Sequence, residues 1–290
     1  MNDRPVCPLC GHANSEKCFS ERNHDLLVCF NCDLFFIHPY TRDTYNKVSI
    51  YDYKNLKILD PTRHYNASRK YFIGKYLAYI QKECEGANSL LDVGCGTGAL
   101  LQLLHEIRPD LRLAGVELNI ERAQFAQRIA GCPVYQAPIE KLSVSEKFDI
   151  ITMINVLSHI SSFDQLFASL RNLMTNNGKL ILKVSEMTNN VRKDAMLDWG
   201  IPDHLHFLGI NTIKFICDKY NFRIVRHIRQ PLAVDLFARW RWLLPGRSRI
   251  RNAVKYTVAL TPLALTVLRK NYERKHKDTI YSSFIVIAPI

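Results

Sequence analysis

The segment SLLDVGCGTG at residues 89–98 constrains the fold of this chain more than any other. Its apolar first half is typical of a short buried strand, and its second half contains Gly94, Gly96 and Gly98. Glycine lets the backbone turn tightly and approach a ligand closely. A helical pattern at residues 99–107 follows directly, and the free N–H groups at a helix start favour a ligand there. The segment therefore predicts a strand, a ligand-binding turn and a helix in succession.

Strand and helix patterns alternate along the rest of the middle of the chain. We expect further strands at residues 111–117, 132–136, 148–155, 179–184 and 222–228. We expect further helices at residues 65–80, 119–131, 162–178 and 211–220. Asn119 is a plausible N-cap, Ser162 and Gln165 form a capping box, and Gly131 and Gly178 mark helix ends. Alternating strands and helices predict an α/β fold with a doubly wound sheet.

Two carboxylates indicate what the turn binds. Glu117 closes the next strand 23 residues after Gly94, where a carboxylate can accept hydrogen bonds from both hydroxyls of a ribose. The pattern Gly94-x-Gly96-x-x-Ala99 also fits the looser fingerprint of nicotinamide dinucleotides. Asp92 argues against a dinucleotide, because its charge would repel a pyrophosphate at close range. A positively charged cofactor without phosphate, such as S-adenosylmethionine, would be attracted instead.

Three segments resemble the signature segments of class I S-adenosylmethionine-dependent methyltransferases. They are LLDVGCGTG at residues 90–98, VEL at 116–118 and FDIITMINVLSHI at 148–160. The resemblance extends from about Tyr65 to Ile228. It implies a Rossmann-like, mostly parallel sheet whose last strand, at residues 281–290, is antiparallel.

The resemblance also implies a set of cofactor-binding residues. They are Asp92, Gly94, Cys95, Gly96, Gly98, Glu117, Leu118, Glu140, Asn155 and His159. Asp92 and the glycine turn would hold the methionine part of the cofactor. Glu117 would bind the ribose, Leu118 would pack on the adenine, and Asn155 would lie near the sulfonium.

The chain departs from the family pattern at two of these places. Family members often carry an acidic residue after the third strand that meets the adenine amino group, and here QAPIE at residues 136–140 offers only Glu140. The family also often has Glu before the histidine of its fourth segment, where this chain has Ser158. His159 is therefore interpreted either as a cofactor-side residue or as a capping or packing histidine.

A loop expected at residues 199–207 carries candidate catalytic groups. Methyl transfer from a sulfonium is an in-line displacement with a neutral leaving group, so the site needs alignment more than acid catalysis. A hydroxyl or carbon-acid acceptor still needs a base. Family members commonly carry a histidine in this stretch, which implies His204 as the base, with Asp203 or His206 supporting it. The alternative is that these residues only structure the loop.

Two CxxC pairs near the N-terminus predict a structural zinc site. Cys7 and Cys10 are separated by 18 residues from Cys29 and Cys32, and two such knuckles complete a closed tetrahedral shell of four sulfurs. The zinc would supply the folding energy of a unit too small for a large core. The alternative is that all nine cysteines are unmetallated thiols. The N-terminal unit, which ends in DLFFIHP at residues 33–39, resembles that of bacterial methyltransferases that modify nucleotide sugars, polysaccharide precursors or secondary metabolites.

The positive charge of the chain is concentrated in one segment. The net charge is +12, and residues 231–280 hold eleven basic and three acidic residues beside two tryptophans and an apolar stretch. This basic insertion could lie on an anionic membrane, bind RNA or a phosphorylated substrate, or form a solvated helical subdomain. RNA is less favoured, because residues 1–40 are slightly acidic.

The composition, 47% apolar and 23% charged, is that of a globular protein. The N-terminus lacks the apolar stretch of a signal peptide, and no apolar run reaches the roughly 20 residues of a membrane span, so we expect a cytoplasmic protein. Five parts are expected: a zinc unit (1–40), a helical linker or cap (41–86), the methyltransferase core (87–230), the basic insertion (231–280) and the final strand (281–290).

The sequence thus favours a methyltransferase that acts on a small or carrier-linked metabolite, with a sugar nucleotide or polysaccharide precursor as the favoured substrate. Three alternatives remain at this level. They are an RNA methyltransferase, a non-catalytic cofactor-binding interaction protein and, remotely, a nicotinamide oxidoreductase.

Overall fold

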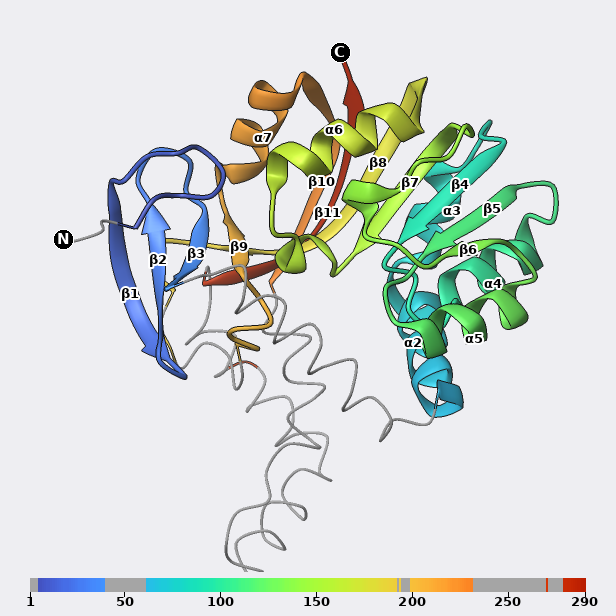
Figure 1. The fold of residues 1–290 in the computed structure, drawn as a ribbon, viewed down its shortest axis with the longest axis horizontal. Helices are drawn as coiled ribbons and strands as arrows, with labels where there is room; N and C mark the ends of the chain where they lie inside the picture. Colours follow the sequence, from blue (N-terminus) through green and yellow to red (C-terminus); the bar gives the residue numbers. More distant parts are fainter. Residues whose placement is uncertain (1–4, 40–60, 192, 194–198, 232–269, 271–278) are drawn as a thin grey trace, which may run out of the picture.

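A computed structural model describes residues 5–39, 61–191, 193, 199–231, 270 and 279–290, and within them eleven strands form one sheet (Figure 1). The parallel part runs in the order β6, β5, β4, β7, β8. These strands are β4 (Ser89–Val93), β5 (Arg112–Val116), β6 (Val134–Tyr135), β7 (Phe148–Ile154) and β8 (Met174–Met187). Next to β8 lies β11 (Ile280–Pro289), which is antiparallel to both β8 and β10 (Phe222–Pro231). The predicted doubly wound sheet with an antiparallel last strand is present.

Helices cover both faces of the sheet. One face carries α2 (Pro61–Lys75), α3 (Leu77–Glu83), α4 (Ala99–Ile107) and α5 (Ile120–Ala130). The other carries α6 (Phe163–Leu173) and α7 (Thr212–Tyr220), with the short helices η2 (Ile139–Lys141) and η3 (Leu157–His159). Successive strand residues point to opposite faces, so Leu180 and Leu182 join one core cluster and Ile181 joins the other.

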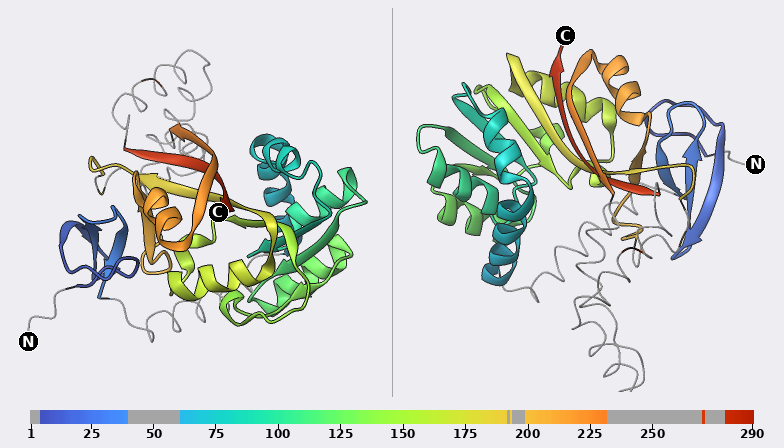
Figure 2. Two further views of the ribbon diagram at one scale, coloured as in Figure 1. Left: turned by 90° about the horizontal axis from the view of Figure 1, so that it is seen from above. Right: turned by 180° about the vertical axis from the view of Figure 1, so that it is seen from behind.

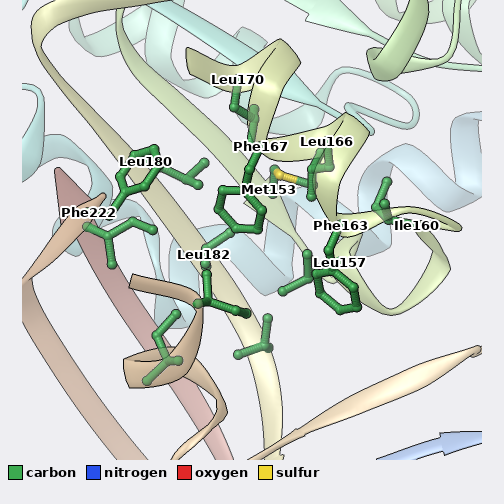
Figure 3. Packing of buried hydrophobic residues seen from close by; sticks show 14 of the residues in the cluster. Met153, Leu157, Ile160, Phe163, Leu166, Phe167, Leu170, Leu180, Leu182 and Phe222 are labelled. Carbon is green, nitrogen blue, oxygen red and sulfur yellow. The ribbon is translucent and has the colours of Figure 1, made fainter. Parts of the chain in front are cut away.

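On the α6 side of the core, buried side chains pack against β7 and β8 (Figure 3). Phe163, Leu166, Phe167 and Leu170 recur at helical spacing on α6 and are fully buried in a cluster with residues of β7, β8 and β10. Burial of each such side chain stabilises the fold by about 1.5–3 kcal/mol. The carboxyl ends of β7 and β8, which form part of the site described below, are thereby held firmly.

Most predicted caps are confirmed, and two helix boundaries differ. Asn119 accepts a hydrogen bond from the Arg122 amide, and Ser162 accepts one from the Gln165 amide. The helix expected to end at Gly178 ends at Leu173, because Met174 already pairs with β7. The helix expected over residues 65–80 is two helices, α2 and α3, that meet at Tyr76.

The N-terminal strands extend the main sheet. The strands β1 (Ser15–Glu21), β2 (His24–Cys29) and β3 (Phe35–His38) form an antiparallel meander at one end of the molecule, opposite α4 and α5 (Figure 2). β3 pairs with β9 (His206–Gly209), and β9 pairs with the last residues of β8. The end of the segment expected to be a loop at 199–207 is thus a strand that joins the N-terminal unit to the sheet.

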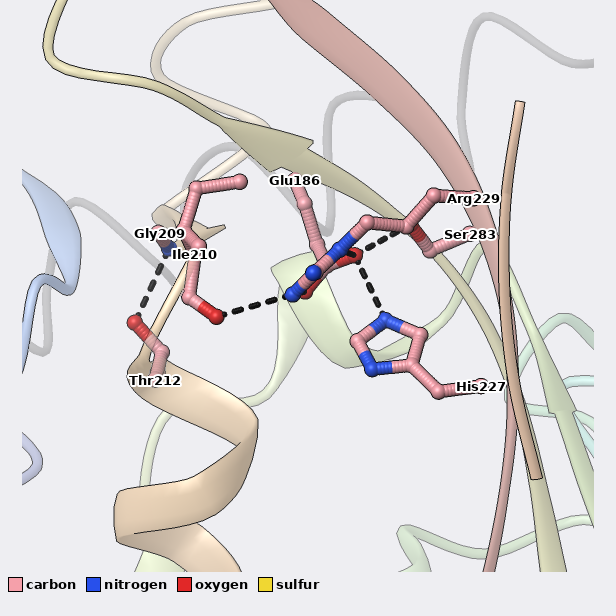
Figure 4. Close-up of polar contacts among 7 residues, drawn as sticks. All are labelled: Glu186, Gly209, Ile210, Thr212, His227, Arg229 and Ser283. Carbon is pink, nitrogen blue, oxygen red and sulfur yellow. Dashed lines mark hydrogen bonds and ion pairs between the residues drawn. The ribbon is translucent and has the colours of Figure 1, made fainter. Parts of the chain in front are cut away.

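A buried ion cluster reinforces this junction (Figure 4). Glu186 of β8 is completely buried and accepts hydrogen bonds from His227 at 2.8 Å, from Arg229 at 3.0 Å and from Ser283. Burial alone would raise the pKa of Glu186, but the hydrogen bonds from His227 and Arg229 outweigh it and lower the pKa. Arg229 also donates to the carbonyl of Ile210, just after β9. Glu186 thus connects β8 to β10 and β11, and Arg229 connects this cluster to the end of β9.

The expectations for residues 41–60 and for nearly all of the basic insertion 231–280 fall outside the described residues. In the part of the chain that is described, every helix is too short or too polar to cross a membrane.

Candidate functional site

A cavity of about 520 Å³ lies at the carboxyl ends of β4, β5 and β7. Its walls also include α2 and the start of α5. The lining residues are His64, Ala67, Ser68, Tyr71, Phe72, Asp92, Gly94, Cys95, Gly96, Thr97, Ala99, Glu117, Arg122, Ile154 and Asn155. Ligands of doubly wound folds bind at this edge of the sheet. Six of the ten predicted cofactor residues line the cavity, while Gly98, Leu118, Glu140 and His159 lie outside its lining.

The three glycines of the turn all have left-handed backbone conformations, with φ of 71° at Gly94, 57° at Gly96 and 75° at Gly98. A Cβ atom on Gly94 would lie 2.4 Å from a methyl carbon of Val156, and one on Gly98 would lie 2.9 Å from the Cα of Ala126. A Cβ on Gly96 would meet nothing within 4 Å. The turn therefore needs glycine for conformation at all three positions and for space at two of them.

Gly98→Ala is expected to destabilise the protein by several kcal/mol, because the new Cβ meets helix backbone that can move only with α5. Gly96→Ala is the matched control, since it carries only the conformational cost of a left-handed alanine, roughly 1 kcal/mol. Urea unfolding of both variants measures the difference. Equal losses of stability would show that the contact with Ala126 is unimportant.

Glu117 is held in place by the turn. Its carboxylate is almost fully buried and accepts hydrogen bonds from the backbone amides of Gly96 and Asn119, each at 2.9 Å. Each carboxylate oxygen has a second lone pair, and the side chain lines the cavity. The arrangement presents a preoriented acceptor at the end of β5.

Asp92 is a buried carboxyl group beneath the turn. It is 3% exposed and accepts a hydrogen bond of 2.6 Å from the Thr152 hydroxyl. Burial, the largest cause, and the charge of Glu117 together raise the pKa of Asp92 to about 7, although the Thr152 hydrogen bond works in the opposite direction. A positive charge in the cavity would restore the ionised form, so this pair of acids favours a cationic ligand.

The sequence anticipates Asn155, but not its partner Lys183 or two residues of the cavity wall, Tyr71 and His64. Asn155 has a left-handed φ of 60° at the end of β7, and its side-chain oxygen accepts a 2.7 Å hydrogen bond from the buried ammonium group of Lys183. Tyr71 and His64 reach the cavity from α2. The only sequence signal for Lys183 is a lysine inside the otherwise apolar run of residues 180–184.

Two of the three candidate catalytic residues, Asp203 and His204, gather with His159 in one cluster. His159 Nδ1 lies 3.5 Å from a carboxylate oxygen of Asp203, and the rings of His159 and His204 meet edge to face at 4.8 Å. His204 Nδ1 lies 2.9 Å from the carbonyl oxygen of Trp199. Burial would raise the pKa of Asp203, but His159, His204 and Arg122 of the cavity wall together lower it. The cluster is therefore electrostatically linked to the cavity.

His206 has a different environment from His204. Its ring is 3% exposed, packs on Phe163 and lies 2.6 Å from the carbonyl oxygen of Leu157. Burial lowers the pKa of His206 to about 3, so the ring is neutral at physiological pH. His206 anchors β9 to the segment that carries His159.

The four predicted metal ligands also come together. The sulfur atoms of Cys7, Cys10, Cys29 and Cys32 all lie within 4.8 Å of one another, and Cys7–Cys32 and Cys10–Cys29 are separated by 3.5 and 3.4 Å. Four sulfurs bound to one zinc at about 2.3 Å would be about 3.8 Å apart. The donor set and its spacing therefore fit a closed tetrahedral site.

Comparison with known proteins agrees with this fold. A family model described as "Methyltransferase domain" matches residues 65–227. An uncharacterized protein of Haemophilus influenzae is 29% identical over 164 residues, which cover 52% of this chain and 63% of the relative. The ubiquinone biosynthesis O-methyltransferase of Glaesserella parasuis is 27% identical over 148 residues, which cover 47% of this chain and 57% of the relative. The chain thus spans about three fifths of the length of these relatives.

Solved methyltransferases share the fold at low sequence identity. Coclaurine N-methyltransferase bound to N-methylheliamine and SAH is 17% identical with a TM-score of 0.51, covering 73% of this chain and 71% of that one. A second neighbour is an O-methyltransferase from a trans-AT PKS multienzyme of Brevibacillus brevis in complex with S-adenosyl-L-homocysteine. It is 13% identical with a TM-score of 0.50, and the match covers 88% of this chain and 81% of that one. Since the family model covers more than half of the chain, this protein belongs to the methyltransferase-domain family and carries an S-adenosylmethionine-dependent methyltransferase domain.

Proposed function

We propose that the chain transfers a methyl group from S-adenosylmethionine to a small or carrier-linked metabolite. The observation that carries the proposal is one cavity that combines the glycine turn with Asp92 and Glu117, beside a cluster of His159, Asp203 and His204. A glycine turn and two acids suit a cationic nucleoside cofactor. The neighbouring cluster suits activation of an acceptor group.

The cofactor roles follow the contacts of each residue. Asp92 and the turn hold the cationic methionine part, and Glu117 accepts the ribose hydroxyls with its remaining lone pairs. Leu118, half-buried just after Glu117, packs on the adenine. Asn155, oriented by Lys183, lies near the sulfonium. Glu140 and His159 stay candidates at the edge of this site.

His204 is proposed to activate the acceptor. Its Nδ1 donates to the Trp199 carbonyl, which places the ring proton on Nδ1 and leaves the Nε2 lone pair as the proton acceptor. During transfer the acceptor forms a bond to the methyl carbon, and the electron pair of the breaking S–C bond stays on sulfur. The acceptor proton goes to His204, and the carboxylate of Asp203 stabilises the cationic ring.

The favoured substrate class is a sugar nucleotide or a polysaccharide or secondary-metabolite precursor. A relative from Saccharopolyspora spinosa, 30% identical over 103 residues, is a dTDP-4-amino-2,3,4,6-tetradeoxy-D-glucose N,N-dimethyltransferase, and one from Anoxybacillus flavithermus is a malonyl-[acyl-carrier protein] O-methyltransferase. Both acceptors are small groups on a larger carrier, which supports this class. The basic insertion 231–280 and its contact with an anionic membrane stay predictions.

Incubation of methyl-labelled S-adenosylmethionine with the purified protein and an extract of its source cells tests the proposal. We expect label in the small polar or lipid fraction. Label in RNA would overturn the substrate class in favour of an RNA methyltransferase. Bound cofactor with no label in any fraction would favour the non-catalytic alternative.

His204→Ala in the same assay is expected to lower turnover by about 100-fold or more, because a positioned base contributes at least that factor. Affinity for S-adenosylmethionine should stay unchanged, since His204 lies outside the cavity lining. His105→Ala, an exposed histidine on α4, is the control. Normal turnover of His204→Ala with normal cofactor binding would remove the base from the mechanism.

The N-terminal part is proposed to be a zinc unit that supports the acceptor side of the site. Three contacts carry this role. The Ile37 amide donates to the Leu205 carbonyl at 3.0 Å, Arg22 donates to the Ile201 carbonyl at 3.0 Å, and Phe19 packs on Trp199 with ring centroids 4.9 Å apart. Residues 199–207, which carry Asp203 and His204, are thus held by residues 5–38. The proposed parts remain 1–40, 41–86, 87–230, 231–280 and 281–290.

A further inference from the structure

We propose that His159, Asp203 and His204 bind a divalent transition-metal cation that holds the acceptor oxygen. The inference rests on the proposed function, because it gives the acceptor-side cluster a ligand. It is separate from the cysteine cluster, which lies in the N-terminal unit and offers four sulfurs. Here the donors are two imidazoles and one carboxylate, a set that suits Mn²⁺, Fe²⁺, Co²⁺ or Zn²⁺ with positions left for a substrate.

The positions of the three side chains fit a shared cation. One ligand atom from each lies within 4.8 Å of the other two. Nδ1 of His159 donates to the backbone carbonyl of Asp203 at 3.1 Å, so His159, like His204, would bind the cation through Nε2. Bonds of about 2.0–2.2 Å to one cation require ligand atoms roughly 3–4 Å apart. The side chains of His159 and Asp203 are 34% and 38% exposed, which leaves them room to rotate toward a shared ion. The same exposure makes the cluster reachable by ions and substrate.

The surroundings of His204 are those of a supported ligand. The Nδ1–H of a metal-binding histidine is commonly donated to a backbone carbonyl, which fixes the ring and its tautomer. His204 has this contact with Trp199, whose side chain is fully buried and donates to the Lys193 carbonyl at 2.9 Å. Gly200 makes room for the ring, because a Cβ there would lie 3.0 Å from His204 Nδ1. The loop therefore aims Nε2 of His204 in a fixed direction.

Three protein ligands leave at least one open coordination position. Two neighbouring oxygens of an acceptor, such as the vicinal hydroxyls of a sugar, could occupy open positions together. The cation lowers the pKa of a bound hydroxyl, so that its proton passes to solvent and its oxygen attacks the methyl carbon. The S–C bond breaks with its electron pair on sulfur, as before. With the cation bound, His204 is a metal ligand, and the cation activates the acceptor hydroxyl in place of the base role described above for His204.

Titration with Mn²⁺, followed by the electron paramagnetic resonance signal of the free ion, tests this site in the zinc-loaded full chain. Mn²⁺ suits the probe because it prefers oxygen and nitrogen ligands over thiolates. We expect one saturable site per chain in the native protein. Asp203→Asn, which keeps the side-chain size and removes the charge, should weaken binding tenfold or more. Asp110→Asn, at an exposed carboxylate on the opposite edge of the sheet, should leave it unchanged.

Two outcomes would overturn the cation site: no saturable Mn²⁺ binding, or binding that Asp203→Asn leaves unchanged. His159→Gln provides a second ligand variant, and thermal unfolding shows that each variant is folded. The binding measurement is independent of methyl transfer. Methyl transfer without a cation would leave His204 as the base, whereas a cation bound without methyl transfer would contradict the proposed function and leave the site standing.

Discussion

Asp92→Asn is expected to bind S-adenosylmethionine about 100-fold more weakly and, at the same time, to make the cofactor-free protein more stable at pH 8. The first effect follows because a buried charged contact with the cationic cofactor is worth roughly 1.5–3 kcal/mol. The second follows because the buried carboxyl resists ionisation. Asparagine retains an oxygen that can accept the Thr152 hydrogen bond, so the local packing is preserved.

The sign of the pH dependence comes from the raised pKa. The pKa of Asp92 is about 7 in the folded protein against an ordinary value of 3.8 for an aspartate. A group raised in this way contributes stability that is fully present below its unfolded pKa and is lost as the pH rises through the folded value. The stability difference between Asp92→Asn and the native protein should therefore widen by about 2.5 kcal/mol between pH 5 and pH 8.

Urea unfolding at the two pH values, without cofactor, measures this difference, and calorimetry measures the cofactor affinity. Asp110→Asn is the control, because Asp110 is exposed and Arg108 lowers its pKa, so no widening is expected. A difference that is constant from pH 5 to pH 8 would show that Asp92 is ionised in the cofactor-free protein. Unchanged affinity would remove Asp92 from the cofactor site.

The parts of the fold that the sequence predicts are those with local causes. The strand, turn and helix at residues 89–107 follow from an apolar run, three glycines and a helical period within one short segment. The caps at Asn119 and Ser162 are equally local, since each bonds an amide three residues away. Even here Met174 pairs with β7 and ends α6 before Gly178, because strand pairing overrides the glycine signal.

The parts that the sequence does not predict depend on partners far apart in the chain. The strand β9 exists because β3 pairs with it, more than 160 residues earlier in the sequence. His159 meets Asp203, 44 residues away, so a histidine interpreted either as a cofactor-side or as a packing residue lies beside two candidate catalytic residues. Lys183 and Asn155 are adjacent only because β7 and β8 are neighbours. No periodicity or motif encodes these pairings.

Loss of the proposed zinc ion from the cysteine cluster is expected to release the acceptor-side segment while sparing the cofactor cavity. A four-sulfur zinc site contributes on the order of 10 kcal/mol to the folding of a small unit. Without it, residues 5–38 should unfold, and the pairing of β3 with β9 would be lost with them. The cavity residues belong to α2, α4, α5, β4 and β7 and to the turns that follow β4, β5 and β7, and none of these strands pairs with β1, β2 or β3.

Cys29→Ser should therefore lower zinc content and speed amide hydrogen exchange in residues 5–38 and 199–209. Turnover should fall by about 100-fold or more, as the support of Asp203 and His204 is lost, while affinity for S-adenosylmethionine changes little. Cys18→Ser is the matched control, since Cys18 lies on β1 of the same unit and outside the cluster. Zinc content that Cys29→Ser leaves intact would contradict the four-sulfur site. Rapid exchange confined to residues 5–38, with full turnover, would show instead that the N-terminal unit does not support the acceptor side.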